Sequence, residues 1–146
     1  MNQEKRTLVI QDDPTRGEGV TVKGMRIRRC NGCVKCITMN PGRCALEDDF
    51  SPVIAQLASH DTVRFVSKVD GNTVPGAVTK AVERISNILQ AYTELGGNTP
   101  LDTEGVRLNR VEIVAIGEPE DRELFERDLR TSLLMGPVET IVFEYL

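Results

Sequence analysis

The two strongest structural signals in the chain lie in residues 62–95, TVRFVSKVDGNTVPGAVTKAVERISNILQAYTEL. The short apolar run Thr62–Val66 predicts a buried strand. From Val78 to Leu95 apolar residues then recur at i, i+3 and i+4, and Gly96-Gly97 follows, which predicts a long amphipathic helix with a glycine end. A strand that leads into such a helix is typical of an α/β fold with a mostly parallel sheet.

The flanking segments continue this alternation in both directions. Further strands are predicted at Thr7–Ile10, Met25–Arg28, Val111–Ile116 and Val138–Tyr145. Helices are predicted to open at Ser51-Pro52 and at Pro119, because proline suits the first helical position. We therefore expect one domain over residues 1–146, with the order β-β-α-β-α-β-α-β and no helix after the first strand.

The composition excludes several classes of function. The net charge is −4, which argues against nucleic-acid or anionic-membrane binding, and Trp is absent while aromatic residues make up 4%. The sequence has no apolar run of membrane-spanning length and no signal-peptide pattern at its polar start. We expect a cytoplasmic protein that binds neither nucleic acid nor membrane.

All four cysteines are close together in the sequence. The spacing is Cys-x2-Cys-x2-Cys-x7-Cys, formed by Cys30, Cys33, Cys36 and Cys44. Thiols at this spacing can converge on one inorganic core, and cysteine thiolates are the ligands of iron–sulfur clusters. Zinc fits less well, because its sites more often use two separated Cys-x2-4-Cys pairs, and a disulfide framework fits less well still.

Two interpretations of the cysteines stay open at this point. A 4Fe-4S cluster would make the chain a redox protein, whereas reduced, empty thiols would serve as small apolar residues in a loop. Arg26, Arg28 and Arg29 directly precede Cys30, so they could offset the charge of a reduced cluster or form an exposed basic strand face. Asp48-Asp49 is predicted to cap the following helix and to be solvated.

Residues 30–85 resemble a known family in both residue types and spacing. The matching segments are Cys30–Cys36, Pro41-Gly42-Arg43-Cys44, Asp48-Asp49-Phe50, the strand region 60–65 and the helix region 80–85. They are similar to the flavodoxin-like NAD(P)H-dependent FMN reductases, in particular to the branch with the iron–sulfur flavoproteins. The resemblance implies a flavodoxin-like three-layer sandwich with a five-stranded sheet of order 2-1-3-4-5, and a site at the carboxyl ends of strands one and three.

The resemblance also implies where FMN would lie. It would sit between a loop at residues 13–21 and a loop at residues 67–76, contacting Asp13, Pro14, Thr15, Arg16, Thr21, Lys68, Val69, Asp70, Gly71 and Asn72. The chain departs from the family at both loops. Carboxylates at Asp12, Asp13 and Glu18 would repel a phosphate, and the helix that should bind it is predicted to be missing.

The expected function is that of a redox protein, with electrons passing singly between FMN and a 4Fe-4S cluster. NAD(P)H or a redox partner protein would exchange those electrons, and the resemblance implies self-association into a homo-oligomer. No catalytic residue is assigned. The alternatives are a flavin-less relic of the fold acting as a non-catalytic binding or assembly module, and a zinc-stabilised interaction domain.

Overall fold

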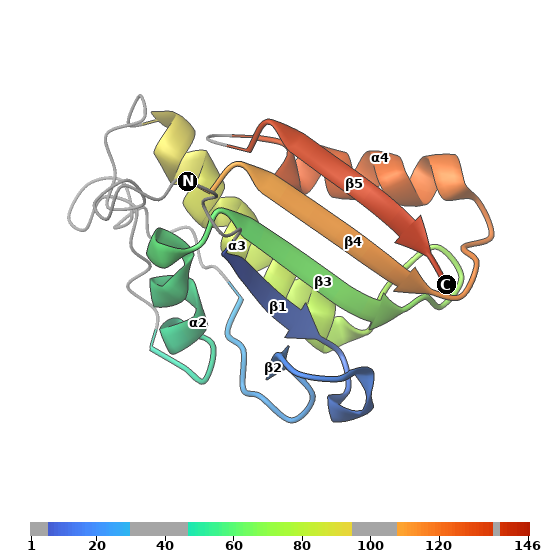
Figure 1. Cartoon of the computed structure of the whole chain (residues 1–146), viewed down its shortest axis with the longest axis horizontal. Helices are drawn as coiled ribbons and strands as arrows, with labels where there is room; N and C mark the ends of the chain where they lie inside the picture. Colours follow the sequence, from blue (N-terminus) through green and yellow to red (C-terminus); the bar gives the residue numbers. More distant parts are fainter. Residues whose placement is uncertain (1–5, 30–46, 95–107, 136–137) are drawn as a thin grey trace, which may run out of the picture.

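Five parallel strands form one sheet in the computed structural model, which describes residues 6–29, 47–94, 108–135 and 138–146 (Figure 1). The sheet order is β2-β1-β3-β4-β5. The strands are β1 (Thr7–Gln11), β2 (Val20–Thr21), β3 (Thr62–Lys68), β4 (Arg110–Ile116) and β5 (Thr140–Tyr145). The helices are α2 (Ser51–Gln56), α3 (Gly76–Glu94) and α4 (Arg122–Leu133), and the 3-10 turns are η1 (Pro14–Arg16) and η2 (Leu57–Ser59).

The predicted fold class is confirmed. The fold is flavodoxin-like α/β, with every strand pair parallel and with the predicted order 2-1-3-4-5. All four cysteines lie outside the described residues, as do the predicted end of α3 at Gly96-Gly97 and the Gly136-Pro137 break. The cluster prediction is therefore neither supported nor contradicted by side-chain geometry.

The predicted second strand at Met25–Arg28 is wrong, because β2 is the two-residue segment Val20–Thr21 beside Ile10–Gln11. The backbone N–H groups of Arg26 and Arg28 instead donate to the carboxylates of Asp49 and Asp48, both at 2.7 Å. The carboxylates of Asp48 and Asp49 thus accept the backbone hydrogen bonds that the carbonyl groups of a neighbouring strand would otherwise accept. The alternating pattern at residues 25–28 therefore marks extended chain held by carboxylates.

The helices α2, α3 and α4 all pack on one face of the sheet. Figure 1 shows α3 and α4 passing behind the strands, and the core lies between the two layers. The apolar stripe predicted for α3 is buried from Val78 to Leu89, and the side chains of Tyr92 and Leu95 lie outside the described residues. Core side chains from the sheet and from α3 include Leu8, Ile10, Val63, Phe65, Val111, Ile113, Val78, Ala81, Ile85, Ile88 and Leu89.

The connection between β1 and β2 lacks a helix, as predicted. It contains only η1, which is three residues long. In a doubly wound sheet the helix at this place would cover the face opposite to α3 and α4. No helix of the described residues lies on that face, so the described elements form two layers, and the third layer of the expected sandwich is not among them.

Candidate functional site

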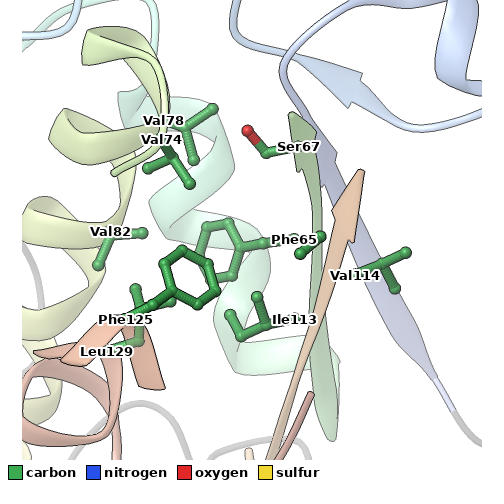
Figure 2. Close-up of a pocket in the computed structure, with 10 residues that line it drawn as sticks. Phe65, Ser67, Val74, Val78, Val82, Ile113, Val114, Phe125 and Leu129 are labelled. Atoms are coloured by element: carbon green, nitrogen blue, oxygen red, sulfur yellow. The ribbon is translucent and has the colours of Figure 1, made fainter. Parts of the chain in front are cut away.

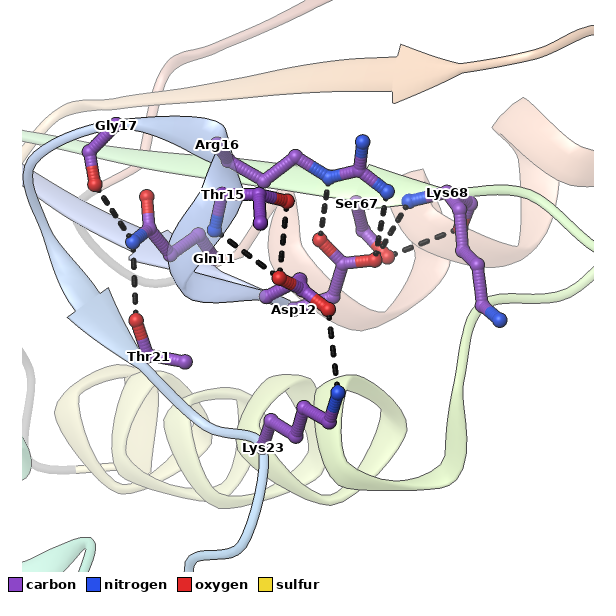
Figure 3. A network of polar contacts seen from close by, with 10 residues as sticks. Gln11, Asp12, Thr15, Arg16, Gly17, Thr21, Lys23, Ser67 and Lys68 are labelled. Atoms are coloured by element: carbon purple, nitrogen blue, oxygen red, sulfur yellow. Dashed lines mark hydrogen bonds and ion pairs between the residues drawn. The ribbon is translucent and has the colours of Figure 1, made fainter.

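The carboxyl edge of the sheet brings the two predicted cofactor loops together. Asp12, directly after β1, donates its backbone N–H to Val66 O at 3.1 Å. Lys68 N–H at the end of β3 donates to Asp12 Oδ2 at 3.1 Å (Figure 3). These contacts join residues more than fifty positions apart in the sequence. The two loops therefore lie at the same edge of the sheet, as predicted. Which ligand the predicted residues bind stays a prediction.

The Asp12 carboxylate occupies the centre of this edge. Arg16 donates to it from Nε at 3.0 Å and from Nη2 at 3.3 Å, and Asp12 is only 8% exposed. Burial acts to raise the pKa of Asp12, but the hydrogen bonds from Arg16 and Lys68 N–H and the charge of Arg16 outweigh it, so the pKa is lowered. Asp12 therefore stays ionised and uses the donors that a bound phosphate would need.

The carboxylate of the next residue, Asp13, is also hydrogen-bonded within the protein. Its carboxylate accepts hydrogen bonds from the Thr15 backbone N–H at 3.0 Å and from the Thr15 hydroxyl at 2.9 Å, which lower its pKa to about 2. Asp13 is thereby the N-cap of η1, with Pro14 as the first residue of that turn. A three-residue turn lacks the aligned peptide dipoles with which a helix N-terminus binds anions.

The far side of this loop is closed by Gln11. Its Nε2 donates to Gly17 O and to Thr21 Oγ1, both at 2.9 Å, so Thr21 ties β2 to the loop. Gln11 Oε1 is buried and has no hydrogen-bond partner in the described part of the chain. A phosphate monoester is mainly a dianion at neutral pH and offers mainly acceptors, so a lone acceptor oxygen is not a suitable partner for it. The loop after β1, as it stands, does not fit the phosphate of FMN.

The second predicted loop is held mainly by backbone contacts. Val69 N–H donates to Ile116 O at 3.1 Å, and Asp70 exchanges two hydrogen bonds with Thr73 at 2.8 and 3.0 Å. Gly71, at φ +63°, accepts a hydrogen bond from Glu120 N–H at 3.0 Å. Asn72 Oδ1 accepts from the N–H of Asp121, the N-cap of α4, at 2.7 Å. Among the predicted residues here, Lys68 and Asp70 have exposed side chains, and the contacts of Asp70 come from its backbone.

A second polar cluster lies at the two ends of the cysteine segment, defined here as residues 29–47. Arg28, just before the segment, donates its N–H to Asp48 Oδ2, just after it. Arg84 of α3 donates from Nη1 to the Asp48 carboxylate and, at 3.1 Å, to Arg28 O. We call these three residues the Asp48 clamp. The clamp brings the chain together on either side of the four cysteines.

The Asp48 clamp is a buried ion pair. The side chains of Arg84 and Asp48 are 1% and 2% exposed, so the predicted solvation of Asp48 is wrong. Burial acts to raise the pKa of Asp48, but hydrogen bonds from Arg28 N–H and Arg84 and the charge of Arg84 lower it overall. Arg84 Nε and Nη2 are buried with no partner among the described residues.

Sequence reasoning missed Arg84, although the helix pattern carries a signal for it. Arg84 lies three residues after Ala81 and four before Ile88, so it belongs to the apolar stripe of α3. A charged residue on a core stripe is rarely fully buried unless it is paired. The search for its partner would have led to the carboxylates at Asp48 and Asp49.

Two cavities of the described structure are lined mainly by apolar and uncharged side chains. Figure 2 shows the apolar pocket between the sheet and the helices, where Phe65, Val82 and Phe125 meet. Its polar side chain, Ser67, donates to Lys68 O at 3.0 Å. A groove of about 180 Å³ between α3 and α4 shares part of this lining and carries one carboxylate, Asp128. The same groove also carries the hydroxyls of Thr73, Thr79 and Ser132, but no hydrogen bond among the described residues joins any of them to Asp128.

The described residues also contain no group of three or more His, Cys, Asp or Glu side chains placed to hold a metal ion. In the same part of the chain, no helix is both long enough and apolar enough to cross a membrane. The candidate sites are therefore the carboxyl edge around Asp12 and the cysteine segment beyond the Asp48 clamp.

The parallel order and the loops at the carboxyl edge define a flavodoxin-like protein. A solved structure with a similar fold is the NAD(P)H:quinone oxidoreductase from Methanothermobacter marburgensis. The TM-score is 0.60 at 11% sequence identity, over 98% of this chain and 87% of that chain, and at this identity the likeness shows the fold. No protein-family model matches the chain, and no curated protein matches it.

Proposed function

We propose that the chain is an electron-transfer protein whose redox group is a 4Fe-4S cluster held by Cys30, Cys33, Cys36 and Cys44. The observation that carries this proposal is the Asp48 clamp, which joins the two ends of the segment containing all four thiols. Four thiolates at this spacing are a donor set that suits an iron–sulfur cluster. The fold, shared with an oxidoreductase, is compatible with this role.

The protein's own contribution is to hold the ligand segment. Bringing two distant points of a chain together costs conformational entropy. The Asp48 clamp holds the two ends of the cysteine segment together in the folded protein, so this part of the cost does not fall on cluster binding. The charge of Arg84 is balanced by Asp48. Arg26, Arg28 and Arg29 directly precede Cys30 in the sequence, and their positive charge would favour thiolates and a negatively charged cluster. The cluster, when bound, supplies one-electron transfer.

FMN is a poor fit to the carboxyl edge in this arrangement. The Asp12 carboxylate holds Arg16 and Lys68 N–H, and Gln11 Oε1 offers only an acceptor. Flavin binding at the predicted residues would require this arrangement to open, so no step of the proposed function passes through FMN. Because NAD(P)H delivers a hydride and a cluster takes one electron, we propose a redox partner protein as the electron donor or acceptor.

The self-filled loop around Asp12 favours a second candidate function. A flavodoxin-like protein that has replaced the phosphate by its own carboxylate could serve as a binding or assembly module with empty thiols. The two functions differ in metal content. The module would contain no iron and show no visible absorption, whereas zinc without absorption would indicate a zinc-stabilised domain.

The test is anaerobic purification of the full chain, with visible spectrum and iron, zinc and flavin analysis of one sample. The proposal predicts broad brown absorption, stoichiometric iron and no flavin. The test variant is Cys44→Ser, which should lose most of the iron. Its control is Ser59→Cys, which adds a thiol outside the cysteine segment and should leave the iron content unchanged. A colourless, iron-free sample that stays colourless after reconstitution with iron and sulfide would contradict the cluster.

A further inference from the structure

The guanidinium group of Arg84 has hydrogen-bond donors that the described protein does not use. A guanidinium carries five N–H groups. Nη1 donates to Arg28 O and to the Asp48 carboxylate, which accounts for its two hydrogens. Nε and Nη2 are buried and have no hydrogen-bond partner among the described residues. Their three N–H groups are therefore unused donors inside the protein, at the clamp that joins the two ends of the cysteine segment.

Unused donors of this kind call for a structural explanation. Buried N–H groups nearly always have an acceptor, and one without an acceptor in the protein indicates a bound group or an ordered water. The Arg84 side chain is 1% exposed, so bulk solvent does not take this role. The ion pair with Asp48 holds the guanidinium in place. We therefore expect an acceptor beside Nε and Nη2 that the described residues do not supply.

The shape of the guanidinium restricts what this acceptor can be. Nε and Nη2 lie on one edge of the planar group, so their N–H bonds form a fork that points in one direction. The buried ring of Phe50 lies over the same group, with its centre 6.0 Å from Cζ of Arg84. Such a fork donates most strongly to a negatively charged group with two neighbouring acceptor atoms.

The fork belongs to a side chain that is tied to both ends of the cysteine segment. Arg28, whose carbonyl accepts from Arg84, precedes Cys30 by two residues, and Asp48 follows Cys44 by four. Two residues of chain span about 7 Å at most, so the covalent chain keeps the first cysteine in the neighbourhood of the clamp. A negatively charged group bound by these thiolates would supply the missing acceptor.

We propose that Nε–H and Nη2–H of Arg84 donate hydrogen bonds to sulfur atoms of the 4Fe-4S cluster in the cysteine segment. This inference rests on the proposed function and assigns to that site a residue from α3. Because Asp48 balances the charge of Arg84, the effect comes from the oriented N–H groups and not from net charge. Hydrogen bonds to the sulfurs help to set the potential of a cluster. Here they stabilise the more negative, reduced state and raise the reduction potential.

The test uses the full chain, produced with arginine labelled with ¹⁵N in its guanidinium group and with the cluster reduced to its paramagnetic state. A hydrogen bond from a labelled nitrogen to a cluster sulfur gives a ¹⁵N coupling in electron–nuclear double resonance. We expect this coupling in the wild type and its loss in Arg84→Lys, which keeps a cation for Asp48 but removes the fork. The reduction potential of Arg84→Lys should also shift to a more negative value.

The other arginines beside or within the cysteine segment provide the control. They are changed together in one variant: Arg26→Lys, Arg28→Lys, Arg29→Lys and Arg43→Lys. This combined variant keeps Arg84 and the backbone groups of the clamp, so it should show the same ¹⁵N coupling as the wild type. It tests the assignment independently, even if Arg84→Lys does not fold.

The outcomes distinguish this inference from the proposed function. A chain that binds the cluster but shows no ¹⁵N coupling would overturn the role of Arg84 and leave the cluster in place. Coupling that persists in Arg84→Lys, or that disappears in the combined variant, would also overturn it, because another arginine would then be the donor. A chain that binds no iron after reconstitution with iron and sulfide would overturn both the proposed function and this inference.

Discussion

The Arg84 guanidinium donates a hydrogen bond to the Asp48 carboxylate, and the two side chains are 1% and 2% exposed. The same guanidinium lies 6.0 Å from the centre of the Phe50 ring and also donates to Arg28 O. Helix α3 is thereby attached to the chain on both sides of the cysteine segment. This single ion pair links the core of the fold to the proposed redox site.

Removing the Asp48 charge is expected to destabilise the protein strongly. Asp48→Asn leaves the buried Arg84 cation without its counter-charge, which costs about 3–5 kcal/mol of unfolding free energy. Urea denaturation measures this loss. Glu118→Gln makes the same chemical change in an exposed pair with Arg122, where the side chains are 60% and 54% exposed, and should change the unfolding free energy far less. If Asp48→Asn lowered the unfolding free energy as little as Glu118→Gln, the Asp48 clamp would not be important for stability.

Acid should weaken the fold through Asp12 and Asp48. Their pKa values are lowered in the folded protein, so the unfolded chain takes up these protons first as the pH falls. The stability that they contribute is full above the unfolded pKa and is lost from about pH 5 downward, through the folded pKa values. Unfolding free energies from pH 7 to pH 3 measure this slope. Asp48→Asn should flatten it, and an unchanged slope would contradict the lowered pKa of Asp48.

The carboxyl edge should gain anion affinity when its internal carboxylate is removed. Asp12→Asn frees the Arg16 guanidinium, so inorganic phosphate should raise the melting temperature of this variant but not that of the wild type. Glu18→Gln changes the same charge on an exposed residue of the same loop and should behave like the wild type. If phosphate stabilises the wild type equally, Asp12 does not fill the phosphate position.

The turn before β2 should tolerate no side chain at Gly19. Its φ is +150°, and a Cβ would lie 2.8 Å from Val9 Cγ1 and 3.0 Å from Val9 O. Gly19→Ala should therefore cost about 2 kcal/mol or more of unfolding free energy. Gly17, at φ +119°, has open space around the same position, so Gly17→Ala isolates the backbone strain alone. Equal costs of the two variants would mean that the contact with Val9 relaxes freely.

Local sequence patterns were sufficient for most of the fold. The strand signal at Thr62–Val66 and the helical stripe from Val78 onward are local patterns of apolar residues, so each element can be predicted from its own segment. The short β2 was missed because two residues show no periodicity. The alternation at Met25–Arg28 was misread because the bonding partners, Asp48 and Asp49, lie more than twenty positions away.

The candidate site was predicted only in part. The charges at Asp12 and Asp13 indicated a loop unsuited to phosphate, but the pairing of Asp12 with Arg16 and Lys68 N–H depends on three-dimensional contacts. The burial of Arg84 was missed because a helical arginine is usually solvated, although its position on the apolar stripe of α3 indicates it. The cysteine spacing remains a sequence-based prediction, since these residues lie outside the described part of the chain.

The most direct test of the redox proposal is an anaerobic reductive titration of the purified full chain, followed by visible absorption. We predict that about one electron per chain bleaches a broad brown absorption, and that Cys44→Ser abolishes this response. Uptake of two electrons with the resolved bands of a flavin would place the redox group at the carboxyl edge instead. No uptake by a chain reconstituted with iron and sulfide would contradict an electron-transfer function.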